Sequence, residues 1–597
     1  MSATAPAPTA GSPAPSPAPA ATAAGGPRGS VWAWLAMAAA VLVAWTALTW
    51  PLAANPDQFW TMKGNARVAA EPNFVSRPGT LSGGDHLQNL FIQSVVLDNL
   101  RALRDPFLDG REGAAGPAPL RTTSLDLPWT LLLGLVWPLA GLVPAYNLSL
   151  ALSSLATGLA AFGWLRRHTR WPLLAGAGAL AYACTPPRMF QLTSHFNALM
   201  WWAFPAALWA FEAMLERQRA GRRWRGPAVS LVAVVLTVAV SGEYHLILYL
   251  AGLLTFLAAW ALLAGLASRR RVPLGPALVA AGAVAAGSAY VLLAFQHVFK
   301  GAVAGENGSW QQVALYAPAS AWALVTKSFG TQGEGMVYVG WPLLVLAALG
   351  VVAAVAWRRA ALPYAVLVVP LVVLTYGPRA DVGSFRPYRF LFDHFPFLSL
   401  QRVPERLMVV TALVLVVLAV TALDAAAALL GGRGARRLAA AALVVATVLL
   451  LADYRVSDNR LRPGLAGNPV VAAMRDAGDR AGPVLGVPVL VPSATWNSAT
   501  TYLAAQSRRR ALNAYNQTPA PWLEERLTRL DPLNHGQADP AALDILRQTG
   551  TRQVVVIDEP RVFAAGEWQA TVDALVASGR FRLVLEAAPL ALLELQA

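Results

Sequence analysis

The sequence has one cysteine and few charged residues. Cys184 is the only cysteine among 597 residues, which excludes an intrachain disulfide and a metal site built from several thiolates. Only 13% of the residues are charged, whereas 56% are hydrophobic and the mean hydropathy is positive. Apolar runs near membrane length recur along the chain, so the composition indicates a polytopic membrane protein.

Lysine is nearly absent as well. It occurs only at Lys63, Lys300 and Lys327, so arginine supplies almost all of the positive charge. A net charge of +15 would favour a nucleic-acid partner in a soluble protein. Here the arginines fall in short clusters between apolar runs, which is typical of cytoplasmic loops, and no nucleic-acid partner is predicted.

The first 30 residues predict a disordered cytoplasmic tail. Residues 1–29 are almost entirely Ala, Pro, Ser, Thr and Gly, with Arg28 as the only charge, and cannot bury a core. The apolar run from Val31 to Ala53 is too long for the hydrophobic region of a cleaved signal peptide. It therefore predicts a retained first span.

Hydropathy predicts eleven spans: 31–53, 146–165, 171–184, 197–215, 226–241, 244–267, 273–297, 335–357, 361–377, 405–430 and 436–453. A twelfth candidate, 127–143, is short and contains Pro138. If it does not cross, every arginine-rich loop lies in the cytoplasm, and if it crosses, all of them lie outside. We therefore predict an interfacial or re-entrant helix there, on the outer side.

This count defines the predicted domains. Residues 31–454 form a transmembrane helical bundle with a long first outer loop at 54–145, and residues 455–597 form a small extracytoplasmic α/β domain. In that domain 482–491 and 551–559 predict buried strands, 540–550 a helix ended by glycine, and FRLVLEAAPLALLEL a closing hairpin. The domain lacks a G-x-G-x-x-G motif and a P-loop, so nucleotide binding has no support.

Asp85 is the first candidate for chemistry. In GGDHLQNLF it precedes Gln88 by three residues, which is a capping-box pattern at a helix start, and a capping carboxylate can also point into a cavity. His86 beside it is a further candidate. The following residues predict a helix that rests on a membrane surface, with one apolar stripe made of Leu87, Leu90, Phe91 and Val95.

Other outer segments carry further candidates. Asp57, in NPDQFW, is either a solvated acid beside an interfacial anchor, Trp60, or a functional group. Glu243, in SGEYH, must stay at the outer interface or face a wet cavity, because a central membrane charge costs about 2.5 to 3.5 kcal/mol. Arg188 and His195 share the short loop TPPRMFQLTSHFN, where a lone histidine is either an interfacial hydrogen-bonding group or a ligand.

Five arginines lie on the outer side against the charge bias that fixes the topology. Phosphate binding and pairing with Glu405 or Asp393 both explain them, and both explanations stay open. They lie in the loop that ends in LQRVPERLM: Arg379, Arg386, Arg389, Arg402 and Arg406.

The order of these motifs resembles the GT-C superfamily of integral-membrane glycosyltransferases, and within it the bacterial YfhO-type group. The resemblance covers about residues 31–597, and no single motif in it is highly specific. It rests on NPDQ, GGDHLQNLF, PAYNLSLALSSLATGLAAFGWLRR, LTSHFNALMWWAFPAALWAFEAML, SGEYHLILYL, LQRVPERLMVV, LNAYNQ and ILRQTGTRQVVVIDE.

The resemblance implies a catalytic carboxylate in the first outer loop, by position Asp85, with Asp57 second. It implies a polyprenyl-phosphate-linked sugar as donor, and as acceptor an envelope glycan, lipid or protein outside the bacterial plasma membrane. The chain departs from better-known members because no second acid follows the third span, unless Glu243 or His195 takes its place. The resemblance leaves a divalent metal as an open question.

The mechanism expected from this resemblance is direct displacement at the anomeric carbon. Asp85 would act as general base, and Arg402 and Arg406, with Arg389 as a further phosphate-binding candidate, would stabilise the departing lipid phosphate. Two alternatives stay open: a transporter or flippase for a lipid-linked saccharide, and a non-catalytic membrane scaffold. Internal repeats would favour the transporter, and the two halves show no convincing self-similarity.

Overall fold

The structure is a computed structural model of the 597-residue chain. It describes residues 31–62, 84–106, 126–193, 195–242, 244–268, 272–294, 310–315, 336–380, 383–395, 403–429, 433–455, 459–465, 467–491, 497–513, 521–560 and 562–596, together with 81, 108–109, 111, 118–119, 317–318, 320 and 322–327.

All eleven predicted spans form helices in this part of the chain. With their flanking turns, eight are long and apolar enough to cross a membrane: α1 (Val31–Thr49), α5 (Leu142–Leu165), α8 (Ala203–Arg219), α10 (Tyr244–Ala267), α11 (Leu274–Ala294), α15 (Leu362–Tyr376), α17 (Met408–Leu429) and α18 (Arg433–Tyr454). The other three are apolar but shorter: α6 (Pro172–Ala183), α9 (Arg225–Val240) and α14 (Trp341–Ala356).

Helix α17 is the centre of the bundle. Its sequence is apolar on all sides, which suits a helix surrounded by other helices, and every residue from Met408 to Ala422 is buried. Helix α14 packs closely on it, because a Cβ added at Gly350 would lie 2.0 Å from the carbonyl oxygen of Leu418. This small residue therefore lets the two backbones approach.

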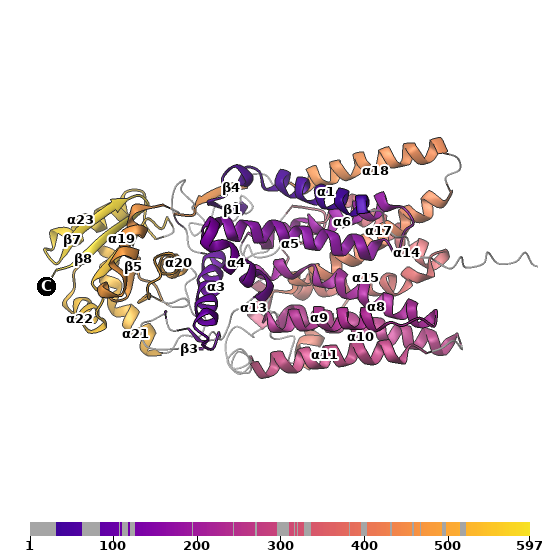
Figure 1. The fold of residues 1–597 in the computed structure, drawn as a ribbon, viewed down its shortest axis with the longest axis horizontal. Coiled ribbons are helices and arrows are strands. Elements are labelled where there is room, and N and C mark those ends of the chain that lie inside the picture. The colour runs from indigo at the N-terminus through magenta and orange to yellow at the C-terminus, as the bar shows by residue number, and fades with distance from the viewer. Residues whose placement is uncertain are drawn as a thin grey trace, which may run out of the picture.

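The arginine-rich connections gather at one end of the bundle, called here the arginine end. Arg167, after α5, forms an ion pair with Glu216 near the end of α8. Asp424, near the end of α17, binds Arg358 at 2.7 Å and accepts a hydrogen bond from Thr169 at 2.6 Å. The α/β domain lies at the opposite end, called the domain end (Figure 1).

Helix α4 (Leu127–Ala140) begins and ends at the domain end. At its start, the backbone N–H groups of Asp126 and Leu127 donate to Ser241 in the turn between α9 and α10. Its end leads directly into α5, where Asn147 donates to the backbone carbonyls of Pro56 and Gln58, in the connection that follows α1. Both ends of the 127–143 segment therefore lie at the same end of the bundle, which agrees with an interfacial or re-entrant helix. The segment leaves three leucines exposed: Leu131, Leu135 and Leu139.

Helix α3 (Asp85–Arg101) runs across the domain end, roughly perpendicular to the bundle helices (Figure 1). The predicted apolar stripe exists, but all four residues are at most 2% exposed. Leu87 and Leu90 belong to the main core, and Phe91 and Val95 pack in a cluster with Ala505 of the α/β domain. The expectation of a stripe resting on the membrane surface is wrong, because the main core covers Leu87 and Leu90 and the α/β domain covers Phe91 and Val95.

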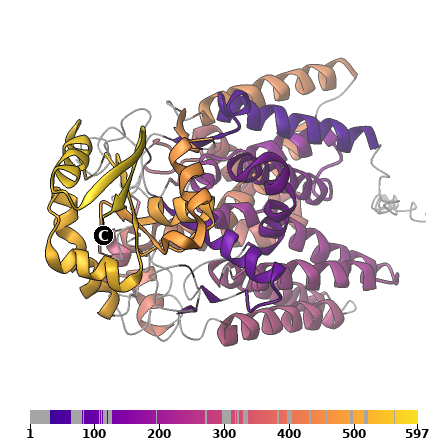
Figure 2. The ribbon, with the colours of Figure 1, turned by 60° about the vertical axis from the view of Figure 1, so that its left-hand side comes forward.

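The α/β domain contains a four-stranded sheet in the order β5 (Val484–Val487), β6 (Gln553–Ile557), β8 (Leu590–Leu595), β7 (Phe581–Ala587). Strands β5 and β6 are parallel and the other pairs are antiparallel. Figure 2 shows this domain in orange and yellow beside the bundle. Its helices are α19 (Pro469–Ala477), α20 (Ser498–Ser507), α21 (Pro521–Leu530), α22 (Pro540–Thr549) and α23 (Glu567–Ala577). The predicted strands, the closing hairpin and the helix ended by Gly550 are confirmed.

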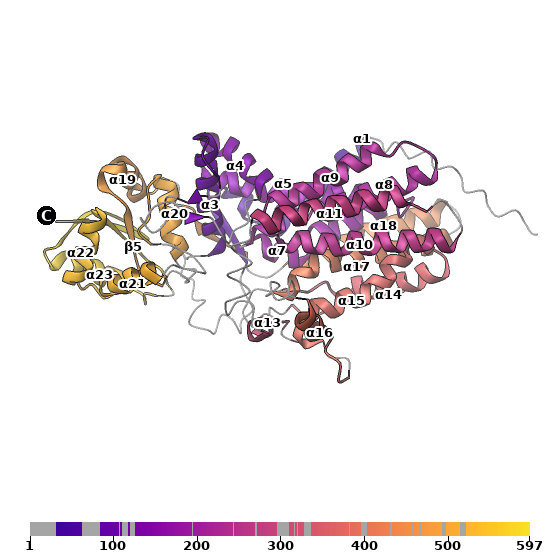
Figure 3. The same ribbon diagram turned by 90° about the horizontal axis from the view of Figure 1, so that it is seen from below.

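Short elements connect the bundle to this domain. Strand β1 (Gln58–Met62) pairs antiparallel with β4 (Asn459–Pro463), and β2 (Leu108–Asp109) pairs with β3 (Ala118–Pro119). The remaining helices are α7 (Pro186–Leu192), α13 (Trp310–Leu315) and α16 (Pro387–His394). Figure 3 shows α13 and α16 together at one side of the bundle.

Candidate functional site

Asp85 is the first residue of α3 rather than its cap. The N-cap residue is Gly84, so Asp85 does not occupy the cap position that the predicted capping box requires. The Gly84 N–H instead donates to the hydroxyl of Ser498, the first residue of α20, at 2.7 Å. The half-buried Asp85 carboxylate lies in the first turn of α3, where a negative charge interacts favourably with the helix dipole.

His195 lies opposite Asp85. Its Nε2 atom is 3.4 Å from Oδ2 of Asp85, and the two side chains are 14% and 31% exposed. They come from segments far apart in the sequence, and the structure places these two candidates side by side. The pair joins a carboxylate and an imidazole, which are the groups most often used for proton transfer.

The backbone around His195 is held by the bundle. Trp129 of α4 and Ser153 of α5 both donate to the Leu199 carbonyl, at 3.1 and 2.9 Å. Tyr146 of α5 donates to the Leu192 carbonyl at 3.4 Å. These bonds fix the segment on both sides of His195, so the position of the imidazole follows from α4 and α5.

Arg188 anchors the same connection from inside. Its guanidinium is fully buried and donates to the hydroxyls of Ser153 and Ser154 and to the Ala183 carbonyl, at 2.8 to 3.0 Å. These hydrogen bonds offset much of the free-energy cost of burying the charge. Because it is covered on all sides, Arg188 belongs to the interior of the bundle rather than to an open surface.

His86 packs in an aromatic cluster. The residue is 7% exposed, and its ring meets the Phe59 ring edge to face, with the ring centroids 5.1 Å apart. Phe59 also meets Tyr146 and Tyr502 edge to face. Tyr502 belongs to α20, so this cluster joins the residue after Asp85 to the α/β domain.

Asp57 lies on an exposed turn before β1. The side chain of Asn147 holds this turn by donating to the carbonyls of Pro56 and Gln58, each at 2.8 Å. Trp60, expected as an interfacial anchor, is only 2% exposed. That expectation is wrong because Trp60 lies in β1, which pairs with β4.

Two of the candidate arginines have clear partners. Nη1 of Arg406 lies 3.0 Å from Nε2 of His245, and because a guanidinium only donates, the imidazole nitrogen accepts. Arg389 binds Asp393 at 2.8 Å and stacks over the Trp310 ring, so the predicted pairing with Asp393 is present. Arg402 and Glu243 lie outside the described residues.

Metal ligands are not clustered in the described ranges. No group of three or more His, Cys, Asp or Glu side chains there is arranged to hold a metal ion. Asp85 and His195 supply two such groups.

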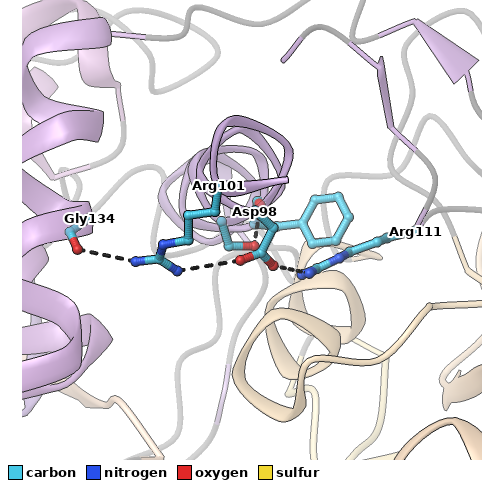
Figure 4. A network of polar contacts seen from close by, with 6 residues as sticks. Asp98, Arg101, Arg111 and Gly134 are labelled. Carbon is cyan, nitrogen blue, oxygen red and sulfur yellow. Dashed lines mark hydrogen bonds and ion pairs between the residues drawn. The ribbon is translucent and has the colours of Figure 1, made fainter. Parts of the chain in front are cut away.

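The far end of α3 is fixed by a second polar network (Figure 4). Asp98 forms an ion pair with Arg111, and Arg101 approaches Asp98 at 3.5 Å while donating to the Gly134 carbonyl of α4 at 3.2 Å. The Arg111 carbonyl accepts from the Ala511 N–H of the α/β domain at 2.7 Å. The sequence offered no signal for these contacts or for Ser498, because their partners lie far away along the chain.

Comparison with known proteins gives distant structural likenesses only. The sequence matches no protein-family model and no curated protein. Among solved structures, the chain is similar to the Archaeoglobus fulgidus oligosaccharyltransferase tethered with an acceptor peptide, with a TM-score of 0.48 and 10% identity over 88% of this chain and 69% of that one. It is also similar to ArnT from Cupriavidus metallidurans bound to undecaprenyl phosphate, with a TM-score of 0.44 and 14% identity over 95% and 98%. These scores and identities establish neither a family nor a function for the chain.

Proposed function

We propose that this protein is a membrane glycosyltransferase of the GT-C type, which moves a sugar from a polyprenyl-phosphate-linked donor to an acceptor in the bacterial cell envelope. One observation carries the proposal: the half-buried Asp85 carboxylate begins a helix that crosses the domain end of the bundle, with the His195 imidazole 3.4 Å away. The order of sequence motifs shared with GT-C enzymes supports the same assignment. In this proposal the domain end faces outward, because the positive-inside rule assigns the arginine end to the cytoplasm.

The reaction follows as a direct displacement with Asp85 as general base. The acceptor hydroxyl attacks the anomeric carbon while its proton passes to the Asp85 carboxylate. The bond from that carbon to the phosphate oxygen breaks, and its electron pair leaves with the lipid phosphate. His195, whose Nε2 faces Oδ2 of Asp85, orients the carboxylate and can carry the proton onward.

The departing phosphate needs positive charge where its negative charge develops. Arg406 is only partly buried, and its guanidinium is oriented by His245. A guanidinium binds two phosphate oxygens at once, which suits this role. Arg402 remains a predicted partner in it. Arg389 is less suited, because Asp393 already neutralises part of its charge.

The test compares Asp85→Asn with Asp57→Asn. Both variants change a carboxylate of the same outer loop into an amide, but Asp57 is exposed on a turn. Envelope glycans are profiled in deletion cells that express each variant at matched level. We expect Asp57→Asn to restore the wild-type profile and Asp85→Asn to resemble the deletion, because loss of a general base costs about a hundredfold to ten-thousandfold in rate.

A wild-type profile from Asp85→Asn would remove the general-base assignment and favour a lipid-linked saccharide transporter or a scaffold. Loss of the glycan in Asp57→Asn alone would transfer the role of base to Asp57. The contribution of His195 to the reaction is tested in the same cells with His195→Gln. We expect this variant to reduce the amount of glycan less than Asp85→Asn does.

A further inference from the structure

The α/β domain touches the chain on both sides of Asp85. On one side, the Ser498 hydroxyl accepts the hydrogen bond from the Gly84 N–H at 2.7 Å, across 414 residues of sequence. Ser498 itself is fully buried, so water cannot easily take its place. This bond satisfies a backbone donor immediately before the helix begins and fixes where α3 starts.

On the other side, the contact passes through aromatic rings. Tyr502 lies one turn after Ser498 in α20, and its ring meets Phe59 with the centroids 5.5 Å apart. Phe59 in turn meets His86, the residue after Asp85. The Tyr502 hydroxyl donates to the Gly464 carbonyl at 2.5 Å, which holds the ring in place.

The same two helices also pack along their length. Phe91, Ile92, Val95 and Val96 of α3 form a buried cluster with Ala505 of α20. Helix α20 is therefore the surface against which α3 is placed, and the bundle supplies the other half of the site through His195. The relative position of Asp85 and His195 depends on how the α/β domain sits on the bundle.

We propose that Ser498 is a positioning residue for Asp85, and that the α/β domain sets the geometry of the Asp85–His195 pair. This inference rests on the proposed function for its catalytic consequence, although the placement of α3 can be measured independently. A carboxylate displaced by about 1 Å loses about a hundredfold in rate, because general-base catalysis requires close approach to the proton.

The experiment uses the full-length protein with Ser498→Ala and, as a matched control, Ser507→Ala. Ser507 is a buried serine of the same helix whose hydroxyl donates to the Leu503 carbonyl within α20. Hydrogen–deuterium exchange with mass spectrometry follows the peptide at the start of α3 and a reference peptide over β6. The envelope glycan is measured in cells at matched protein level.

We expect Ser498→Ala to speed exchange at the start of α3 by about tenfold, because the loss of one hydrogen bond changes the local stability by about that factor. Exchange over β6 should not change. The glycan should fall at least tenfold, since positioning errors of this kind are costly. Ser498→Thr, which keeps the hydroxyl acceptor, should recover both quantities. Ser507→Ala should change neither, which separates positioning from a general loss of stability.

Exchange and glycan amounts within about twofold of wild type in Ser498→Ala would overturn the inference. So would loss of the glycan without faster exchange at the start of α3. Ser498→Cys, which keeps the side chain's size and weakens the acceptor, replaces the alanine variant if that variant accumulates poorly. If Asp85→Asn leaves the glycan unchanged, the proposed function fails, and the exchange measurement still decides whether Ser498 holds α3.

Discussion

The contact between α3 and α20 can be weakened at one residue, Phe91. This ring is fully buried and belongs to the small cluster that joins the two helices. Phe91→Ala removes the largest side chain of that cluster and leaves a cavity. Ala505 is the residue that α20 contributes to this cluster, so the cavity lies at the contact between the two helices.

The expected cost follows from comparable core substitutions. Replacing a buried phenylalanine by alanine costs about 3 to 5 kcal/mol, and a small cluster that can partly collapse belongs at the lower end. A loss of about 3 kcal/mol raises the equilibrium constant for separation of the two helices by about 150-fold. The bundle itself should be unaffected, because its core is built from other residues.

Hydrogen–deuterium exchange of the purified protein measures this directly. We expect faster exchange in peptides of α3 and α20, with unchanged protection in α17. The control is Phe385→Ala, which makes the same chemical change at a ring that is 52% exposed. The reasoning is refuted if Phe91→Ala changes exchange in α3 by less than about twofold, or if Phe385→Ala has an equal effect there.

Three further predictions concern orientation, packing and pH. A membrane-impermeant amine reagent should modify Lys327, at the domain end beside Asp453, in intact cells, and modification only after permeabilisation would invert the topology. Gly350→Ala should lower the free energy of unfolding in detergent by about 1 to 3 kcal/mol. Gly282→Ala, with open space around the added methyl group, should be neutral. Equal melting temperatures for the two variants would contradict the close packing at Gly350. Burial raises the pKa of Tyr502, so the wild type should lose stability as pH rises above the ordinary tyrosine pKa of about 10. Tyr502→Phe should be less stable than the wild type near pH 8, but its stability should fall less at alkaline pH. The same alkaline loss of stability in both proteins would refute this.

Much of the fold was predictable because it follows from local composition. Apolar length predicted every helix of the bundle, and Pro138 with the arginine distribution predicted that the 127–143 helix differs from them. In the α/β domain, continuous apolar runs and a glycine stop gave β5, β6 and α22. The sequence did not predict that the helix within the predicted span 335–357, α14, has only 16 residues.

The candidate site was predictable in its residues but not in its arrangement. Asp85 and His195 stood out because charged or titratable groups are rare in this chain, yet nothing in either loop indicated that they meet. The capping box failed for a related reason. The local sequence pattern makes Asp85 the cap of the helix. In the folded chain the Ser498 hydroxyl instead accepts a hydrogen bond from the N–H of the preceding residue, Gly84.

The sequence by itself therefore determined that the chain is a helical membrane bundle with one arginine-rich end, since hydropathy and charge act through short stretches of chain. Tertiary structure alone decided that the apolar face of α3 meets α20 instead of lipid, and that Asp85 faces His195. A stripe of leucine and phenylalanine is buried equally well by a bilayer or by another helix, because the hydrophobic effect has no direction. Hydrogen bonds and ring contacts across more than 400 residues supply the direction, and they exist only once the α/β domain has folded onto the bundle.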